Sequence, residues 1–162
     1  MSFGFSVGDF IVLLELANRV RKQFIDAPHQ FTAISDECRS LSSVLFEADV
    51  VLSTPGASAQ QSNQAKTIIE SCRALLEEIS SSVESLAGVT EQDGSATSKA
   101  KRMWQRLKWD AKTIEGFRSR ISSNVPMLNG IISQQTQQNI LVVRGGVDKL
   151  VDRKETQHRM KY

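Results

Sequence analysis

The sequence predicts an all-α fold: an antiparallel four-helix-type bundle with a short basic helix before a long, kinked final helix. Apolar residues recur at spacings of three and four along most of the 162-residue chain, as they do on one face of a helix. Aromatic residues make up only 6% of the chain, and nine Gly with three Pro leave few helix breakers. No strand-period alternation and no βαβ pattern competes, and the length suits one domain.

The first predicted helix covers about residues 7–25. Ser6 precedes it as a predicted N-cap, and the Asp9 carboxylate suits the positive end of the helix dipole. The first half of this helix, residues 10–14, is apolar on all sides. That pattern indicates burial on more than one side, or an apolar partner.

The second and third predicted helices carry heptad seams. Pro28 opens the second helix, where its missing N–H costs nothing, and residues 54–56 end it. Its seam consists of Phe31, Ile34, Cys38, Leu41, Leu45, Ala48 and Leu52. Ser58 and Gln61 are the predicted caps of the third helix. The third seam repeats the spacing at Ala65, Ile68, Cys72, Leu75 and Ile79. A polar loop is expected over residues 88–97.

A short basic segment, residues 99–109, precedes the long final helix, for which Asp110 is the predicted N-cap. The apolar face of the final helix is formed by Ile114, Phe117, Ile121, Val125, Leu128 and Ile132. The same spacing continues at Ile140, Val143, Val147 and Leu150. We therefore expect one amphipathic element to close the bundle.

Two features interrupt this last element. Pro126 lies inside the helical pattern, so we expect a kink near residues 124–125. The glycine pair at residues 145–146 is a second weak point. We place the bundle domain at residues 1–153 and expect a charged, frayed tail over residues 154–162.

The formal net charge of +2 conceals an asymmetry. Residues 1–98 hold 6 Lys and Arg against 13 Asp and Glu, a balance of −7. Residues 99–162 hold 14 against 5, a balance of +9. The basic part is expected to face an acidic surface, either a lipid headgroup layer or the acidic helices of the same bundle.

Several functional classes have no support in the sequence. The N-terminus lacks the basic region of a secretory signal, and no apolar stretch reaches the roughly 20 residues of a transmembrane helix. Two cysteines form neither a disulfide framework nor a zinc set, which favours a reduced, cytoplasmic setting. Gly-rich phosphate loops, HExxH and GxSxG are absent. We expect no enzymatic activity, catalytic residue, cofactor or metal.

The N-terminal segment is the first candidate functional site. Residues proposed for membrane or partner insertion are Phe3, Phe5, Phe10, Ile11, Leu13 and Leu14. One interpretation is a core helix with an aromatic lead-in. The other is a helix that leaves the bundle and enters a membrane or another protomer. Alone it is too short to span a bilayer, and Asp9 and Glu15 are costly in hydrocarbon.

The basic segment is the second candidate site. Its residues proposed to contact an anionic surface are Lys99, Lys101, Arg102, Trp104, Arg106, Lys108 and Trp109. Cations interleaved with Trp suit an anionic membrane interface. In the alternative interpretation, Trp104 and Leu107 pack on the bundle and the cations are solvated. Nucleic acid is not an expected partner, because no recognition motif accompanies the charges.

Seven short segments follow one another in a characteristic order: MSFGFSVGDFI at 1–11, AN at 17–18, DAP at 26–28, ISDE at 34–37, LS at 41–42, WQRLKW at 104–109 and SRISSN at 119–124. In this order they resemble the fungal N-terminal domain of STAND proteins, a group related to HeLo-like domains. The resemblance covers the chain to about residue 153.

The resemblance implies an N-terminal effector of a fungal NOD-like receptor, followed in that group by nucleotide-binding and repeat domains. Related HeLo-like domains oligomerise, move from the cytoplasm to the plasma membrane and permeabilise it, in regulated cell death and non-self recognition. The implied membrane-active part is residues 3–16, and the implied partners are anionic lipid and further copies of the chain. The alternative function is a signalling scaffold that binds another helical domain without entering lipid.

Overall fold

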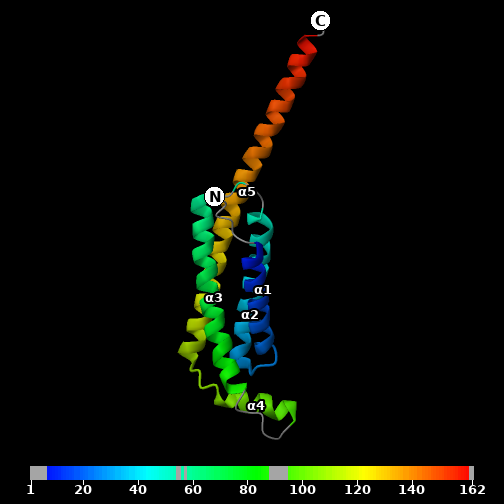
Figure 1. Ribbon diagram of the computed structural model, residues 1–162. Helices are drawn as coiled ribbons and strands as arrows, with labels where there is room; N and C mark the ends of the chain where they lie inside the picture. The colour runs from blue at the N-terminus through cyan, green and yellow to red at the C-terminus, as the bar shows by residue number, and fades with distance from the viewer. Residues whose placement is uncertain (1–6, 54–55, 57, 88–94, 161–162) are drawn as a thin grey trace.

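Five α-helices form this protein in the computed structural model, which describes residues 7–53, 56, 58–87 and 95–160. The helices are α1 (Val7–Phe24), α2 (His29–Leu52), α3 (Ala59–Ala87), α4 (Ala96–Arg106) and α5 (Ala111–Arg159) (Figure 1). No strand occurs in the described ranges. The prediction of an all-α bundle with a short helix before a long final one is confirmed.

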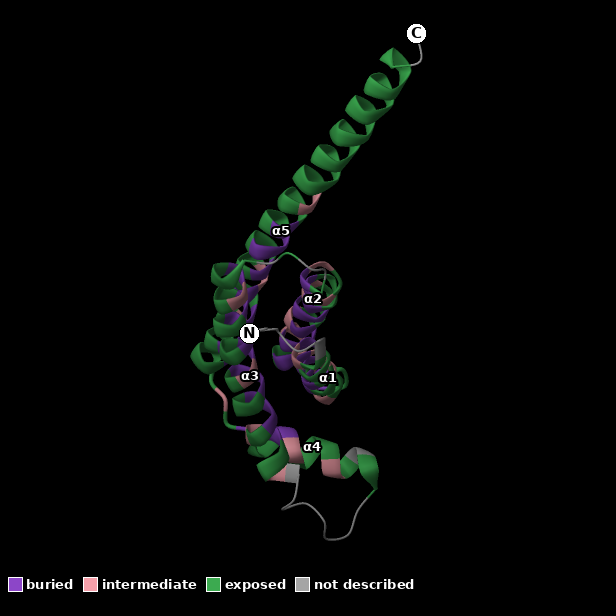
Figure 2. Ribbon diagram, turned by 45° about the horizontal axis from the view of Figure 1, so that its top comes forward, coloured by how far each residue is buried: buried purple, intermediate pink, exposed green. Residues whose placement is uncertain are grey.

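The four long helices pack around one core. α1 and α5 each pack against both α2 and α3, so α2 and α3 lie diagonally across the core. α1 runs parallel to α3, because Asp9 pairs with Arg73 while Gln23, further along α1, contacts Glu84. By contrast, α1–α2 and α3–α5 are antiparallel neighbours, and α2–α5 is a second parallel pair (Figure 1). α4 lies across one end of the bundle and contacts α3 (Figure 2).

The predicted caps that fall in the described ranges are confirmed. The Ser58 N–H donates to Oε1 of Gln61 at 2.9 Å, and the Gln61 N–H donates to Oγ of Ser58 at 3.2 Å. This reciprocal pair is a capping box at the start of α3. At α5 the Thr113 N–H donates to Oδ1 of Asp110 at 2.7 Å. The predicted cap Ser6 and residues 88–94 of the predicted polar loop lie outside the described residues.

The predicted heptad seams line the core. Every seam position of α2 and of α3 is buried, including Cys38 and Cys72. The largest fully buried side chains of α1 and α2 are Phe10, Leu13, Phe24, Phe31, Ile34, Leu41 and Leu45. The same apolar cluster includes buried side chains of α3 and α5, so the core is continuous along the bundle.

α5 is one continuous helix through Pro126. Proline has no N–H to donate to the carbonyl of Ser122, one turn earlier. Both residues are exposed, so solvent can satisfy that carbonyl. The helix also continues through residues 154–159, where we expected a frayed tail. The basic side chains of His158 and Arg159 lie in its last turn, where positive charge favours the negative end of the helix dipole.

The packed part of α5 ends well before the predicted domain boundary at residue 153. Gln135 is the last buried residue described in α5, and every residue from 140 to 160 is exposed (Figure 2). The reason is the length of the neighbouring helices: α2 ends at Leu52 and α3 begins at Ala59 near the same end of the bundle (Figure 1). We call residues 136–159 the extension.

Candidate functional site

The proposed insertion residues of the N-terminal segment divide between the core and the surface of α1. Phe10 and Leu13 are buried in the bundle, and Leu14 is half-buried against the core. Ile11 is 44% exposed and its neighbour Val12 is 53% exposed. Phe3 and Phe5 lie outside the described residues. In this structure α1 is therefore a core helix with a narrow exposed apolar edge.

Contacts with α3 hold α1 in the bundle at both of its ends. Arg73 of α3 approaches Asp9 at 4.0 Å, and both side chains are half-exposed. Near the other end, Nε2 of Gln23 donates to Oγ of Ser80 and to Oε1 of Glu84, each at 3.4 Å. These polar contacts, which are exposed or partly buried, are individually weak, so the buried apolar face of α1 supplies most of its attachment.

The aromatic side chains of the basic segment pack into the bundle. Trp104 is only 7% exposed, and its ring centroid lies 5.2 Å from those of both Phe24 and Phe31. Trp109 is half-buried, 4.8 Å from Phe117 in centroid distance. These five rings join α1, α2 and α5 to the end of α4. In this structure Trp104 is a core residue, as in the alternative interpretation of the sequence.

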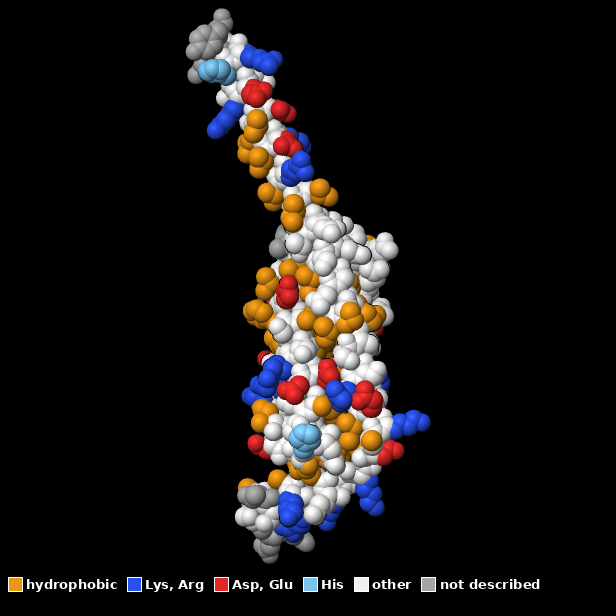
Figure 3. Space-filling view, turned by 180° about the vertical axis from the view of Figure 1, so that it is seen from behind, with side chains coloured by type: hydrophobic (Ala, Val, Ile, Leu, Met, Phe, Trp, Pro, Cys, Tyr) orange, Lys and Arg blue, Asp and Glu red, His pale blue; other side chains and the backbone are white. Residues whose placement is uncertain are grey.

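The cations of the basic segment remain on the surface. Lys101, Arg102, Arg106 and Lys108 are exposed, and Lys99 is half-buried. Figure 3 shows Lys and Arg side chains gathered at this end of the molecule. Because the tryptophans pack into the bundle, the segment presents positive charge to a partner, without tryptophan side chains that could insert into it.

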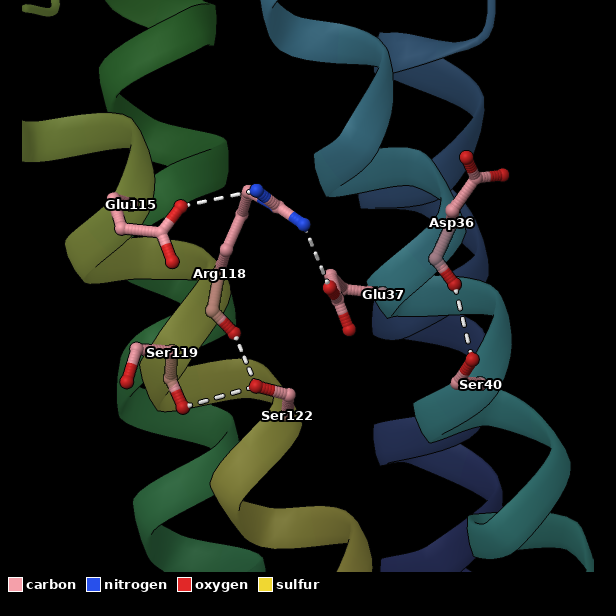
Figure 4. Close-up of polar contacts among 7 residues, drawn as sticks. All are labelled: Asp36, Glu37, Ser40, Glu115, Arg118, Ser119 and Ser122. Carbon is pink, nitrogen blue, oxygen red and sulfur yellow. Dashed lines mark hydrogen bonds and ion pairs between the residues drawn. The ribbon is translucent and has the colours of Figure 1, made fainter. Parts of the chain in front are cut away.

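Part of the charge asymmetry is neutralised inside the bundle. Arg118 of α5 pairs with Glu37 of α2 at 3.3 Å and with Glu115 of its own helix at 3.0 Å (Figure 4). Arg120 of α5 pairs with Glu78 of α3 at 2.9 Å. The basic final helix thus contacts both acidic helices beside it. These pairs lie in the packed half of α5 and leave the cations of the extension unaffected.

The extension carries the largest exposed apolar group among the described residues. Seven large side chains within residues 140–151 are between 49% and 75% exposed: Ile140, Leu141, Val142, Val143, Val147, Leu150 and Val151. Figure 3 shows hydrophobic side chains on one face of the projecting helix, with charged side chains toward its tip. We call Ile140, Val143, Val147 and Leu150 the apolar stripe, because their heptad spacing places them on one face.

We expected the apolar stripe to help close the bundle, but in the structure it faces solvent. One signal was present. The spacing of three and four breaks between Ile132 and Ile140, where residues 133–139 contain only polar side chains. About two helical turns without a large apolar side chain therefore separate the packed face from the stripe.

The extension has a weak intrinsic tendency to form a helix. Gly145 and Gly146 lie in its middle, and nothing stands within 4 Å of where a Cβ would be at either. Glycine is unfavourable inside a helix, and β-branched residues, which dominate residues 140–151, are mediocre helix formers. A helix of about 20 residues with this composition gains most of its stability from packing.

The described part of the chain contains no metal-ligand cluster, and its two cysteines are buried. No group of three or more His, Cys, Asp or Glu side chains among the described residues could hold a metal ion. Burial raises the pKa of the Cys38 and Cys72 thiols to about 12, so neither is a thiolate near neutral pH. In the part of the chain that the structure describes, no helix combines the length and apolarity needed to cross a bilayer.

No family model, no curated protein and no solved structure matches this chain. The resemblance to fungal STAND N-terminal domains therefore stays a prediction from short segments of sequence. The features that bear on function are the geometry of the bundle, its basic end and its extension.

Proposed function

We propose that this chain is a non-enzymatic helical scaffold that associates with other protein helices through its extension, without entering lipid. One observation carries the proposal: seven large apolar side chains are exposed together on the part of α5 that projects beyond the bundle. Exposed apolar groups of this extent are typical of interaction surfaces. Heptad spacing within the group specifically suits a partner helix.

The energetics support a moderate, reversible association. Complete burial of a Val, Leu or Ile side chain is worth about 1.5–3 kcal/mol, so the four stripe residues of one chain supply about 6–12 kcal/mol. Association itself costs about 4–15 kcal/mol in lost freedom, which consumes most of that gain. A partner that contributes an equal stripe would double the favourable part. A partner helix without an apolar stripe of its own would not supply enough favourable free energy for stable association.

The scaffold proposal is tested by measuring molecular mass and lipid binding together. Light scattering of the intact chain is expected to give a mass above 18.0 kDa at micromolar concentration. Flotation with anionic liposomes is expected to leave the protein in the lipid-free fraction. A chain that floats with the liposomes, or that stays at 18.0 kDa at every concentration, would contradict the proposal.

Two matched substitutions locate the association surface. Leu150→Glu places a charge in the apolar stripe, whereas Leu141→Glu places the same charge on another face of the same helix. The two leucines are similarly exposed, at 61% and 65%. We expect Leu150→Glu to lower the mass to that of one chain and Leu141→Glu to leave it unchanged. Equal effects would mean that the stripe is not the surface used.

A second candidate function is membrane permeabilisation by an oligomer in regulated cell death, which the family resemblance implies. The observation that favours it is the cluster of exposed cations at the α4 end, together with the exposed edge of α1 at Ile11 and Val12. α1 would have to leave the bundle, which exposes Phe10 and Leu13 and opens the core. Recruitment from the cytoplasm to the plasma membrane would then depend on anionic lipid.

Dye release from anionic liposomes tests this second function. The intact chain would be compared with a chain lacking residues 2–14 and with Leu14→Glu. Permeabilisation by α1 predicts leakage from the intact chain and a clear loss in both variants. Val12→Glu, at an exposed position, changes the edge of α1 while leaving the core filled. Equal leakage from all variants, or none from any, would exclude α1 as the membrane-active part.

A further inference from the structure

We infer that the partner of the extension is a second copy of this chain, and that the two extensions pack antiparallel along their apolar stripes. This inference rests on the scaffold function proposed above and specifies its partner. The stripe faces solvent in the single chain, so a second copy can reach it without opening the bundle. Three features of the extension point to this arrangement: its apolar register, the charge of Lys154 and the central Gly146.

The apolar register of the stripe is self-complementary. Ile140, Val143, Val147 and Leu150 are spaced by three, four and three, which makes two consecutive pairs of heptad core positions. An antiparallel alignment centred at residue 145 places Ile140 against Leu150 of the second copy. It also places Val143 against Val147 of the second copy. Each of the four layers then consists of apolar side chains from both chains.

The charge at the next position of the seam favours the antiparallel orientation. Arg144 and Asp148 lie on the same flank of the stripe, one turn apart and both exposed. In the antiparallel alignment Arg144 lies two residues from the levels of both Asp148 and Arg144 of the other copy, so this flank favours neither orientation. The alignment does place Lys154, at the next position of the seam, level with the uncharged Thr136 of the other copy. A parallel alignment would instead place Lys154 opposite Lys154 of the second copy. Like charges at a core position disfavour that orientation.

The glycine pair lies at the centre of the proposed contact. Gly146 flanks the stripe, and within the single chain no neighbouring atom requires a residue without a side chain there. In the antiparallel alignment the two copies of Gly146 lie at nearly the same level, where a missing Cβ lets the backbones approach closely. The arrangement therefore accounts for Gly146, which otherwise only weakens an exposed helix.

The bundles are separated by this arrangement. Gln135, the last packed residue of α5, lies about ten residues from the centre, which corresponds to about 15 Å along the helix. The two bundles consequently lie at opposite ends of a shared helix pair. Their basic α4 ends, which are remote from the extension, point away from each other and remain accessible (Figure 1).

The orientation is tested by a distance measurement between spin labels on Met160→Cys in the full chain. Met160 is 79% exposed, whereas both native cysteines are fully buried, so the label attaches to the introduced thiol. Residue 160 of one copy lies level with residue 130 of the other, so at about 1.5 Å per residue the labels are about 45 Å apart. Parallel helices of about 10–12 Å diameter would hold them within about 25 Å.

The possible outcomes distinguish a failure of the antiparallel pairing from a failure of the scaffold function. We expect twice the 18.0 kDa mass, a distance near 45 Å, and loss of that distance when Leu150→Glu is added. Leu141→Glu should preserve it, and Leu150→Glu should weaken association by at least tenfold. A dimer with the short distance overturns the antiparallel pairing and leaves the scaffold function standing. A chain that is monomeric throughout, or that floats with liposomes, overturns both.

Discussion

The two halves of α5 have similar sequence patterns, but the apolar face of the first half is buried and that of the second half is exposed. Residues 111–135 bury Ile114, Phe117, Ile121, Asn124, Leu128, Ile131, Ile132 and Gln135. Residues 140–159 have the same spacing of three and four, yet every one of them is exposed. The comparison teaches that periodicity predicts which side of a helix is apolar. Whether that side is buried depends on the length of its neighbours.

Polar contacts also hold the packed half of α5. The packed half of α5 makes ion pairs to α2 through Arg118 and to α3 through Arg120, and Arg120 also lies over the Phe117 ring at 5.9 Å. The extension, by contrast, is exposed at every residue from 140 to 159. The first half is thus held by the bundle. The second half exposes its large apolar side chains to solvent.

The largest difference between the halves should appear in truncation of a leucine. Leu128→Ala removes a fully buried side chain and should cost about 2–5 kcal/mol of unfolding free energy. Leu150→Ala, measured at a concentration where the chain is monomeric, should change it by no more than about 0.5 kcal/mol. Urea unfolding followed by Trp fluorescence measures both. Similar costs would mean that the extension is packed in solution.

Cysteine reactivity should differ between the buried core and the exposed extension almost as strongly as the cost of leucine truncation does. Burial raises the pKa of Cys38 and Cys72 to about 12, while an exposed thiol ionises near pH 8.5. At pH 8 the thiolate fraction of the native cysteines is therefore about a thousandfold lower than that of a cysteine introduced at residue 147. Chromogenic thiol titration of the folded Val147→Cys chain should detect one fast thiol. Three fast thiols would contradict the buried positions.

The same two cysteines predict a loss of stability at high pH. Their pKa is higher in the folded chain than in the unfolded chain, so folding favours the neutral thiol. This contribution is fully present below the unfolded value of about 9 and declines as the pH rises from there toward about 12. Replacing either with Ala would remove its share of this dependence, which unfolding measurements at pH 8 and pH 10 can compare.

A smaller effect is expected at the glycine pair. Replacing Gly145 and Gly146 with Ala should stabilise the extension as a helix by about 0.5–1 kcal/mol per site, because alanine loses less backbone freedom. Hydrogen exchange should slow for amides of residues 140–159 in the monomer and stay unchanged in α2 and α3. Slower exchange throughout the bundle would show that the two halves of α5 do not respond separately.

The smallest effect concerns the cap at the start of the packed half. Hydrogen bonds from Thr113 hold the pKa of Asp110 below its ordinary value of 3.8. The cap therefore stabilises the fold above that value, and its contribution is lost as the pH falls through the lower folded pKa. Asp110→Asn keeps a capping oxygen that does not titrate, so its stability should fall less between pH 5 and pH 2. An identical pH dependence would contradict this role.

Local features of the bundle were largely predictable from sequence. The caps at Ser58, Gln61 and Asp110 are within three residues of the groups they bind, and the seams of α2 and α3 follow a short period. The surroundings of the candidate functional sites were less predictable from the sequence. Trp104 could be placed on a basic amphipathic segment, but its burial against Phe24 and Phe31 depends on helices far away in the sequence.

The sequence by itself determined the helices, their apolar faces and the caps where α3 and α5 begin, since each depends on interactions within a few residues. Only the tertiary structure decided that α1 and α3 run parallel and that Trp104 belongs to the core. It also decided that the apolar stripe faces solvent. The physical reason is that burial requires a second surface at the same level, and α2 and α3 end before the stripe begins.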